Sequence, residues 1–159
     1  MKVLHNLKPI YDIESKILVL GSMPSVTSRD IGFYYANKTN RFFPILEKLY
    51  NVKLETIEDK EFFLHKNHIA LWDTIKSCEI NASDDSSIKN VIPNDITKII
   101  NESKIECIFC TGKKSYEIFN KYINSNLPCI LLPSPSAANA SFSLDRLVKE
   151  YEVIKKYTS

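Results

Sequence analysis

Four short runs of apolar residues constrain the fold of this chain more than any other feature. They occupy residues 17–20, 69–72, 107–110 and 129–132, and each is hydrophobic at nearly every position. Continuous hydrophobicity, rather than alternation, is typical of strands in a parallel sheet that is covered on both faces. The four runs therefore predict a four-stranded parallel sheet in the interior of the protein.

Helical stretches alternate with these runs. In the last of them apolar residues recur at helical spacing after Ser143, which is placed as an N-cap. The expected helices cover residues 41–50, 58–66, 95–102 after an Asn94 cap, 113–123 and 144–157, and the polar stretch 81–89 is expected to be a loop. This order predicts an α/β fold, a three-layer α/β/α sandwich. At 159 residues and 44% hydrophobic content, we expect one domain over residues 1–159.

Two loops of unusual composition follow the first and the fourth apolar run. Residues 21–43 place several aromatic side chains around the amide of Asn40, whereas residues 132–140 are rich in Ser and Pro and carry almost no charge. Because parallel strands end at the same edge of a sheet, both loops should leave the edge at which open α/β sheets bind ligands. Aromatic faces, an amide and a stiff Ser/Pro segment suit the binding of a flat heterocycle beside a backbone.

The pattern of these loops resembles the uracil-DNA glycosylase superfamily and, within it, the hypoxanthine-DNA (deoxyinosine) glycosylase branch. Its specific part is G-x-x-P from Gly21, followed by Y-Y-A-x-x-x-N-x-F-aromatic from Tyr34. The resemblance continues through LWDTIKSCEINASDDSSI, PND and ANASFSLDRL at residues 71–88, 93–95 and 138–147. It implies the same sandwich fold and a DNA-repair enzyme that hydrolyses the N-glycosidic bond of a deaminated base, hypoxanthine above all, and leaves an abasic site.

The resemblance implies that Asn40 is the catalytic residue. Much of the superfamily has an Asp or Asn at the third position of the first motif to orient the attacking water, but here that position is Met23. In the hypoxanthine branch the catalytic amide lies downstream and matches Asn40, whose carbonyl could accept a hydrogen bond from water. The alternative is that Asn40 only caps the following helix. The motifs contain no evident amine nucleophile, so we expect a monofunctional enzyme without lyase activity.

The resemblance assigns the binding of the base to Ser22, Met23, Tyr35 and Asp73. Tyr35 matches the aromatic residue that stacks on the extruded base. Asp73 lies where uracil-specific relatives have a base-reading Asn. Its carboxylate could accept from hypoxanthine N1–H, while backbone N–H groups near Ser22 and Met23 satisfy O6. Core packing is the alternative for the aromatic residues, and capping of the turn at Thr74 is the alternative for Asp73.

The second loop resembles the motif that enters the minor groove and fills the gap left by the flipped nucleotide. The residues implied to contact DNA are Ser134, Pro135, Ser136 and Ala137, with the two hydroxyls as phosphate donors. An ordinary strand-to-helix turn is the alternative. Many relatives have a His at the position of Leu132, and its absence argues against departure of a uracil anion. A purine can leave after protonation at N7 or with the help of hydrogen bonds.

The cysteines and histidines receive no catalytic role. Cys107 and Cys110 have a spacing found in metal sites, and some superfamily members carry an iron–sulfur cluster. In a strand, however, these two side chains would point to opposite faces. We therefore expect reduced core cysteines, no metal and no other cofactor. The three histidines, His5, His65 and His68, lie outside the motifs.

The expected partner is DNA that contains deaminated bases. A net charge of +2 means that DNA binding must depend on local positive charge. Basic residues near the motifs are Lys38, Arg41, Lys113 and Lys114, although a solvated surface is the alternative for each. The N-terminus lacks the apolar core of a signal peptide, and no run approaches membrane-spanning length. We expect a cytoplasmic monomer that needs neither a membrane nor an obligate protein partner.

Three other functions stay open at this point. The first is a uracil or mismatch glycosylase, against which the Asp at position 73 and the absent His at position 132 argue. The second is a non-catalytic nucleic-acid-binding domain on the same fold, which Met23 favours and Asn40 opposes. The third is an enzyme acting on free nucleosides, for which a loop that enters DNA would have no use.

Overall fold

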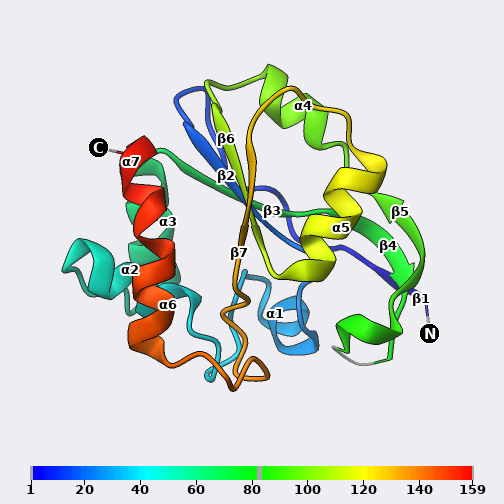
Figure 1. The fold of residues 1–159 in the computed structure, drawn as a ribbon, viewed down its shortest axis with the longest axis horizontal. Helices are drawn as coiled ribbons and strands as arrows, with labels where there is room; N and C mark the ends of the chain where they lie inside the picture. The colour runs from blue at the N-terminus through cyan, green and yellow to red at the C-terminus, as the bar shows by residue number, and fades with distance from the viewer. Residues whose placement is uncertain (1, 82–83, 159) are drawn as a thin grey trace.

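The computed structural model describes residues 2–81 and 84–158 and has a parallel sheet at its centre (Figure 1). The strands of this sheet are β2 (Ile17–Gly21), β3 (Ile69–Asp73), β6 (Cys107–Thr111) and β7 (Cys129–Leu132). Their order is β3-β2-β6-β7, and every neighbouring pair is parallel. The predicted four-stranded parallel sheet is therefore confirmed.

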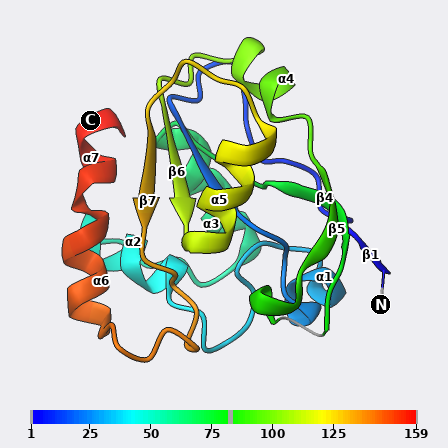
Figure 2. The same ribbon diagram turned by 45° about the vertical axis from the view of Figure 1, so that its right-hand side comes forward.

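Helices cover both faces of this sheet (Figures 1 and 2). One face packs on α2 (Phe42–Tyr50), α3 (Ile57–Lys66) and α6 (Leu144–Tyr151), and the other on α4 (Ile96–Asn101) and α5 (Lys113–Tyr122). Successive strand residues point to opposite faces, so Val19 enters the first apolar cluster and Leu20 the second. Because both faces are buried, each strand must be hydrophobic throughout. The predicted α/β/α sandwich is confirmed.

A second, smaller sheet lies beside the first and was not predicted. It consists of β1 (Lys2–Leu4), β4 (Ile75–Glu79) and β5 (Lys89–Pro93), paired antiparallel in the order β1-β4-β5. A short 3₁₀ turn, η1 (Asp85–Ser87), precedes β5, so the loop predicted for residues 81–89 is partly structured; residues 82 and 83 lie outside the described part. Since only Thr74 separates β3 from β4, this sheet brings the N-terminal segment next to the end of β3.

Two helix predictions need correction, and one helix was missed. The helix α1 (Val26–Ile31), with Ser25 as its N-cap, was not predicted. Asp95, and not Asn94, caps α4, because the Asp95 side chain accepts from the backbone N–H of Lys98. Finally, the helix predicted for residues 144–157 consists of α6, the 3₁₀ turn η2 (Glu152–Ile154) and α7 (Lys155–Thr158), with Ser143 as the N-cap of α6 as expected.

Cys107, Cys110 and Cys129 lie in the parallel sheet as free thiols, and Cys78 lies in β4 of the smaller sheet. Cys107 belongs to the apolar cluster on one face and Cys110 to the cluster on the other, as strand geometry predicts. The Cys110 Sγ lies 3.6 Å from the Sγ of Cys129 on the neighbouring strand. Within residues 2–81 and 84–158, no group of three or more His, Cys, Asp or Glu side chains is placed to hold a metal ion. In the same part of the chain, no helix has the length and apolar character needed to cross a membrane.

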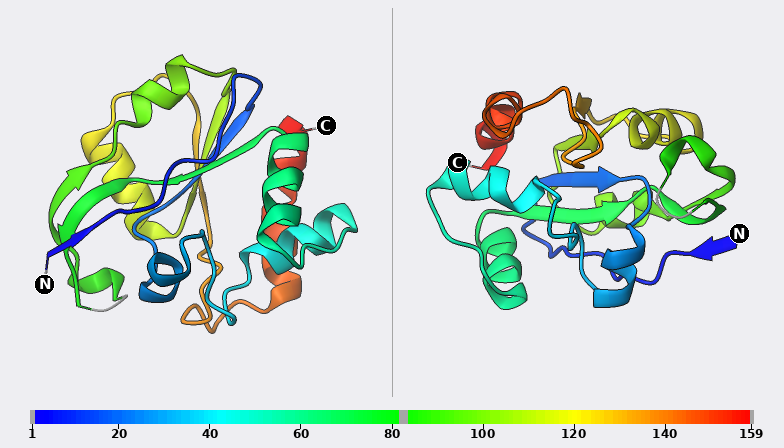
Figure 3. Two further views of the ribbon diagram at one scale, coloured as in Figure 1. Left: turned by 180° about the vertical axis from the view of Figure 1, so that it is seen from behind. Right: turned by 90° about the horizontal axis from the view of Figure 1, so that it is seen from below.

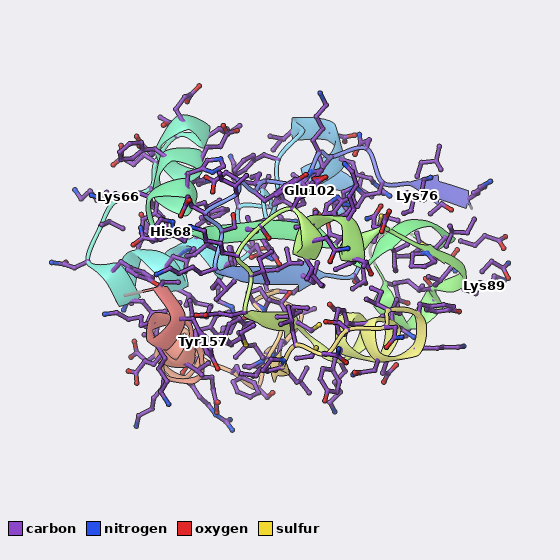
Figure 4. The ribbon with its side chains drawn as sticks, turned by 90° about the horizontal axis from the view of Figure 1, so that it is seen from above. Lys66, His68, Lys76, Lys89, Glu102 and Tyr157 are labelled. Atoms are coloured by element: carbon purple, nitrogen blue, oxygen red, sulfur yellow. The ribbon has the colours of Figure 1, made fainter. Side chains whose placement is uncertain are left out.

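The loops after β2 and β7 leave the same end of the parallel sheet. Seen from that end, in the right-hand view of Figure 3, the two loops face the viewer. Figure 4 looks at the opposite end, where His68, Glu102 and Tyr157 are labelled. The strands therefore carry both loops to one edge, as the parallel arrangement requires.

Candidate active site

A cavity of about 200 Å³ lies at this edge of the sheet, between the two loops. Pockets for drug-sized ligands usually measure about 300 to 1,000 Å³, so this volume suits a single heterocycle. All nine residues predicted for the site line it: Ser22, Met23, Tyr35, Asn40, Asp73, Ser134, Pro135, Ser136 and Ala137. Residues from three separate parts of the sequence are thus brought together as the strand arrangement predicts.

The first loop is held in shape by Ser28, a buried residue of α1. The Ser28 Oγ accepts from the backbone N–H of Ala36 (3.0 Å), which folds the loop back onto the helix. Gly32 ends α1 in the left-handed conformation. Tyr35 is also left-handed, with a φ of 52°, a conformation that bulky residues rarely adopt. These contacts turn the Tyr35 side chain towards the cavity.

The Tyr35 ring forms one wall of the cavity. It stacks on Phe42, with ring centroids 4.1 Å apart and an angle of 24° between the planes. Its hydroxyl lies 3.1 Å from the Thr111 Oγ1, which itself donates to the Leu20 carbonyl, so the tyrosine is the donor. Burial, and then the negative charge of Asp73, raises the pKa of Tyr35. The phenol therefore stays neutral and acts as a rigid aromatic surface.

Asn40 is both a helix-start residue and a cavity residue. The N-cap position of α2 is Arg41, so Asn40 lies one residue before the cap; its Oδ1 nevertheless accepts from the backbone N–H of Phe42, the first helical residue, at 2.9 Å. Its own backbone N–H donates to the carbonyl of Asn37 (2.9 Å), and the residue lines the cavity. An amide oxygen has two acceptor sites, so one bond to Phe42 fixes the side chain and leaves a second acceptor site. The two interpretations of Asn40 are compatible.

Asp73 is the last residue of β3 and is 4% exposed. Its Oδ2 lies 2.8 Å from the Nε2 of His5, and its Oδ1 lies over Gly21, so close that it leaves no room for a Cβ there. The backbone N–H of Thr74 donates to the Gly21 carbonyl (2.9 Å), so the neighbouring strand, and not an Asp73 cap, holds the turn. The carboxyl group thus lies buried on the floor of the cavity.

His5 was missed by the sequence analysis. Its side chain is 2% exposed, and it reaches Asp73 because β1 pairs with β4. The backbone N–H of His5 also donates to the Lys76 carbonyl (2.8 Å). A single histidine near the N-terminus, outside every motif, carries no local signal of such a contact. The small sheet, which was also missed, creates it.

The second loop is held by its own hydroxyls and by Arg41. The Ser134 Oγ accepts from the Ser136 backbone N–H (3.2 Å), and the Ser136 Oγ accepts from the Ala138 N–H (3.1 Å). Both hydroxyls therefore retain an O–H that can donate. Pro135 is buried, whereas Ala137 and Ala138 are exposed. The tip of the loop is thus formed by small residues after a buried proline.

Arg41 is half-buried and does not behave as a solvated surface charge, the alternative considered above. Its guanidinium donates to three carbonyls of the second loop, those of Pro135, Ser136 and Asn139, and to the carbonyl of Phe142 just after it. In contrast, Lys38 and Lys113 are exposed, and the Nζ of Lys114 forms an ion pair with the Oε2 of Glu117 at 3.9 Å. Arg41 therefore holds the second loop in place, a role that no sequence pattern indicated.

Two further contacts fix the start of the second loop. Gly112 has a φ of 107°, which favours glycine, and its backbone N–H donates to the Leu132 carbonyl at 2.8 Å. The Tyr151 hydroxyl donates to the Pro133 carbonyl at 2.6 Å. Leu132, where a His was considered, is a buried core residue. The loop therefore starts from rigid surroundings.

Comparisons with known proteins agree with this geometry. Residues 8–157 match the family described as the Uracil DNA glycosylase superfamily. The chain is 30% identical over 151 residues to a Hypoxanthine DNA glycosylase of Methanosarcina acetivorans, a match that covers 93% of this chain and 95% of that protein. It is 29% identical over 112 residues to a Hypoxanthine DNA glycosylase of Methanosarcina barkeri, covering 69% and 71% respectively.

A solved structure has the same fold. The solution NMR structure of a candidate uracil DNA glycosylase from Methanosarcina acetivorans superposes with a TM-score of 0.81 and 27% sequence identity. The match covers 98% of this chain and 99% of that one. The layers described above are thus those of a structure determined experimentally.

Proposed function

Because this chain belongs to the uracil DNA glycosylase superfamily, we propose that it is a DNA glycosylase that removes hypoxanthine from deoxyinosine and leaves an abasic site. The observation that carries this proposal is the meeting of Asn40, Tyr35, Asp73 and the second loop at one cavity. An amide, an aromatic wall, a carboxylate and a loop suited to DNA meet the requirements for holding and cleaving a flipped nucleotide. The two relatives described above as hypoxanthine DNA glycosylases support the same substrate.

Asn40 positions the water in this proposal. The sugar develops oxocarbenium character as the base leaves, so the reaction needs an oriented water more than a strong nucleophile. The bond from Phe42 N–H to the Asn40 Oδ1 holds the amide still. Its remaining acceptor site can then accept a hydrogen bond from the water and direct the water's lone pair to the anomeric carbon.

Tyr35 and Asp73 bind the base. A flipped base loses its stacking neighbours, and Tyr35, already stacked on Phe42, extends an aromatic column for it. The Asp73 carboxylate accepts from N1–H, and backbone N–H groups near Ser22 and Met23 bind O6. The backbone N–H bonds to O6 also stabilise negative charge on the departing purine, for which the chain has no His at position 132, whereas the Asp73 carboxylate holds the base in place through N1–H.

The second loop contacts the DNA. Ser134 and Ser136 donate to phosphates, and the exposed tip at Ala137 fills the space of the flipped nucleotide. The burial of Pro135 supports a role in shaping the loop beside the contact with DNA. Among the described residues that line the cavity there is no lysine, which supports a monofunctional enzyme, since lyase chemistry needs a Schiff-base lysine.

The test is a single-turnover assay on oligonucleotides that contain inosine, xanthine or uracil, with the purified protein and no added metal. We expect inosine to be cleaved fastest and the product to be an intact strand with an abasic site. Faster cleavage of uracil would make the protein a uracil glycosylase. DNA binding without cleavage of any substrate would make it a non-catalytic domain.

A further inference from the structure

The proposed chemistry uses Asp73 but gives no role to His5, whose buried side chain is hydrogen-bonded to Asp73. The two side chains are 2% and 5% exposed, and the Nε2–Oδ2 distance is 2.8 Å. The imidazole lies edge-on to Trp72, with ring centroids 6.3 Å apart, and tilted against Tyr34 at 6.2 Å. Main-chain pairing holds the residue as well, because its N–H donates to Lys76. The ring therefore has a fixed orientation.

The backbone of Leu7 determines which nitrogen of His5 carries the proton. The Leu7 N–H donates to the His5 Nδ1 at 3.3 Å, so Nδ1 must present a lone pair. The proton of the neutral ring then resides on Nε2, which donates to the Asp73 Oδ2. A second proton on Nδ1 would face the Leu7 N–H directly. The main chain thus fixes the direction of both hydrogen bonds.

The direction of these hydrogen bonds also determines which oxygen of Asp73 is left for the cavity. Asp73 lines the cavity, and because Nε2–H occupies Oδ2, the oxygen left to accept from a base is Oδ1, which lies over the bare backbone of Gly21. An ionised carboxylate can only accept. Hypoxanthine presents N1–H and suits this oxygen, whereas adenine presents a lone pair at N1 and opposes it. The hydrogen bonds that run from Leu7 through His5 to Asp73 would therefore distinguish hypoxanthine from adenine.

We propose that His5 is a positioning residue that sets the specificity of the site: it fixes Asp73 as a hydrogen-bond acceptor, so that the site admits 6-oxopurines with N1–H and rejects adenine. This inference rests on the proposed glycosylase function and deepens it. His5 need not touch the base. It acts on selectivity through the orientation and hydrogen-bonding state of the carboxylate.

Two amide substitutions separate the roles of the two ring nitrogens. In His5→Gln the amide NH₂ can occupy the place of Nε2–H and donate to Asp73. In His5→Asn the shorter side chain keeps its polar group near the place of Nδ1, beside Leu7, and leaves Asp73 without its donor. Both variants replace the ring by a neutral amide, so each is the control for the other.

The measurement is the affinity for oligonucleotides that carry non-cleavable 2′-fluoro analogues of deoxyinosine or deoxyadenosine, together with the cleavage rate on inosine. We expect His5→Gln to keep the preference for inosine over adenine. His5→Asn should lower it roughly 10- to 100-fold, the usual effect of a hydrogen bond to a charged group. Unchanged preference in both variants would overturn the inference, and so would equal losses in both, which would assign the effect to the volume of the ring.

A nearly isosteric change at Asp73 tests the same inference if the His5 variants fail to fold. With His5 in place, Asp73→Asn should turn its amide oxygen to Nε2–H and its NH₂ to the cavity, which offers adenine N1 a donor. We therefore expect the preference in Asp73→Asn to shift towards adenine. A preference for inosine equal to that of the wild type would overturn the inference. If the wild-type protein fails to cleave inosine, the proposed function fails, whatever the variants bind.

Discussion

The backbone N–H of Arg41 donates to the carbonyl of Pro135 at 2.9 Å, which joins the residue after Asn40 directly to the second loop. The Arg41 guanidinium adds bonds to the carbonyls of Ser136 (2.8 Å) and Asn139 (3.1 Å). The group proposed to position the water and the loop proposed to contact DNA are therefore parts of one hydrogen-bonded unit. Displacement of either loop should affect the other.

Arg41→Lys should slow the cleavage of inosine paired with cytosine by about 10-fold, because a compact ammonium cannot bridge several carbonyls. Single-stranded inosine should be affected less, since its base does not have to be unpaired from a duplex. Single-turnover rates on the two substrates give the comparison. Arg146→Lys is the matched control, because Arg146 is exposed and lies at 4.1 Å over the ring of Phe142, just after the same loop. Similar losses in the two variants would contradict a specific role for Arg41.

Asn40→Ala should slow the chemical step by roughly 10²- to 10⁴-fold, the scale expected for a positioned proton or water partner. DNA affinity should change little, and loss of the bond to Phe42 N–H should cost about 1 kcal/mol of stability. Rates at saturating enzyme and thermal unfolding measure the two effects. Thr56→Ala removes a cap from α3 away from the cavity and serves as the control. If both variants retain the wild-type rate, Asn40 is only a cap.

Gly21→Ala should impair the recognition of hypoxanthine, because the new methyl group would overlap the Asp73 Oδ1 and must displace the carboxylate. We expect the cleavage rate on inosine to fall at least about 10-fold through loss of a charged hydrogen bond. Gly32→Ala provides the contrast. No heavy atom would lie within 4 Å of a Cβ at position 32, but the φ of 86° there is strained for alanine. The variant should therefore lose about 1 kcal/mol of stability and keep the wild-type cleavage rate on inosine. A normal inosine rate in Gly21→Ala would remove Asp73 from base recognition.

Ala137→Asp should weaken DNA binding by about 10-fold at low salt, because it places a negative charge at the exposed tip of the second loop. Added salt should lower the affinity of the wild-type protein, since phosphate contacts release counterions. Titrations at several salt concentrations measure both effects. Asn126→Asp adds the same charge at an exposed position before β7, at the other end of the strand. Equal weakening by both changes would point to net charge rather than to this loop.

The sequence by itself determined the central sheet and the place of the site. Runs such as residues 107–110 are apolar at every position, which is typical of a strand covered on both faces. Once these strands are parallel, the loops that follow them must leave one edge. Asn40 and Ser134 could therefore be placed together without knowledge of any contact between them.

The tertiary structure alone decided the contacts that organise the site. The small sheet was missed because its strands are short and contain polar residues, including lysines at positions 76 and 89, so they lack a continuous apolar run. His5 meets Asp73 across 68 residues, and the Arg41 guanidinium meets the second loop and Phe142 across 94 to 101 residues. Hydrogen bonds between residues so distant in the chain leave no local pattern, because their geometry arises only when the strands pair and the loops pack.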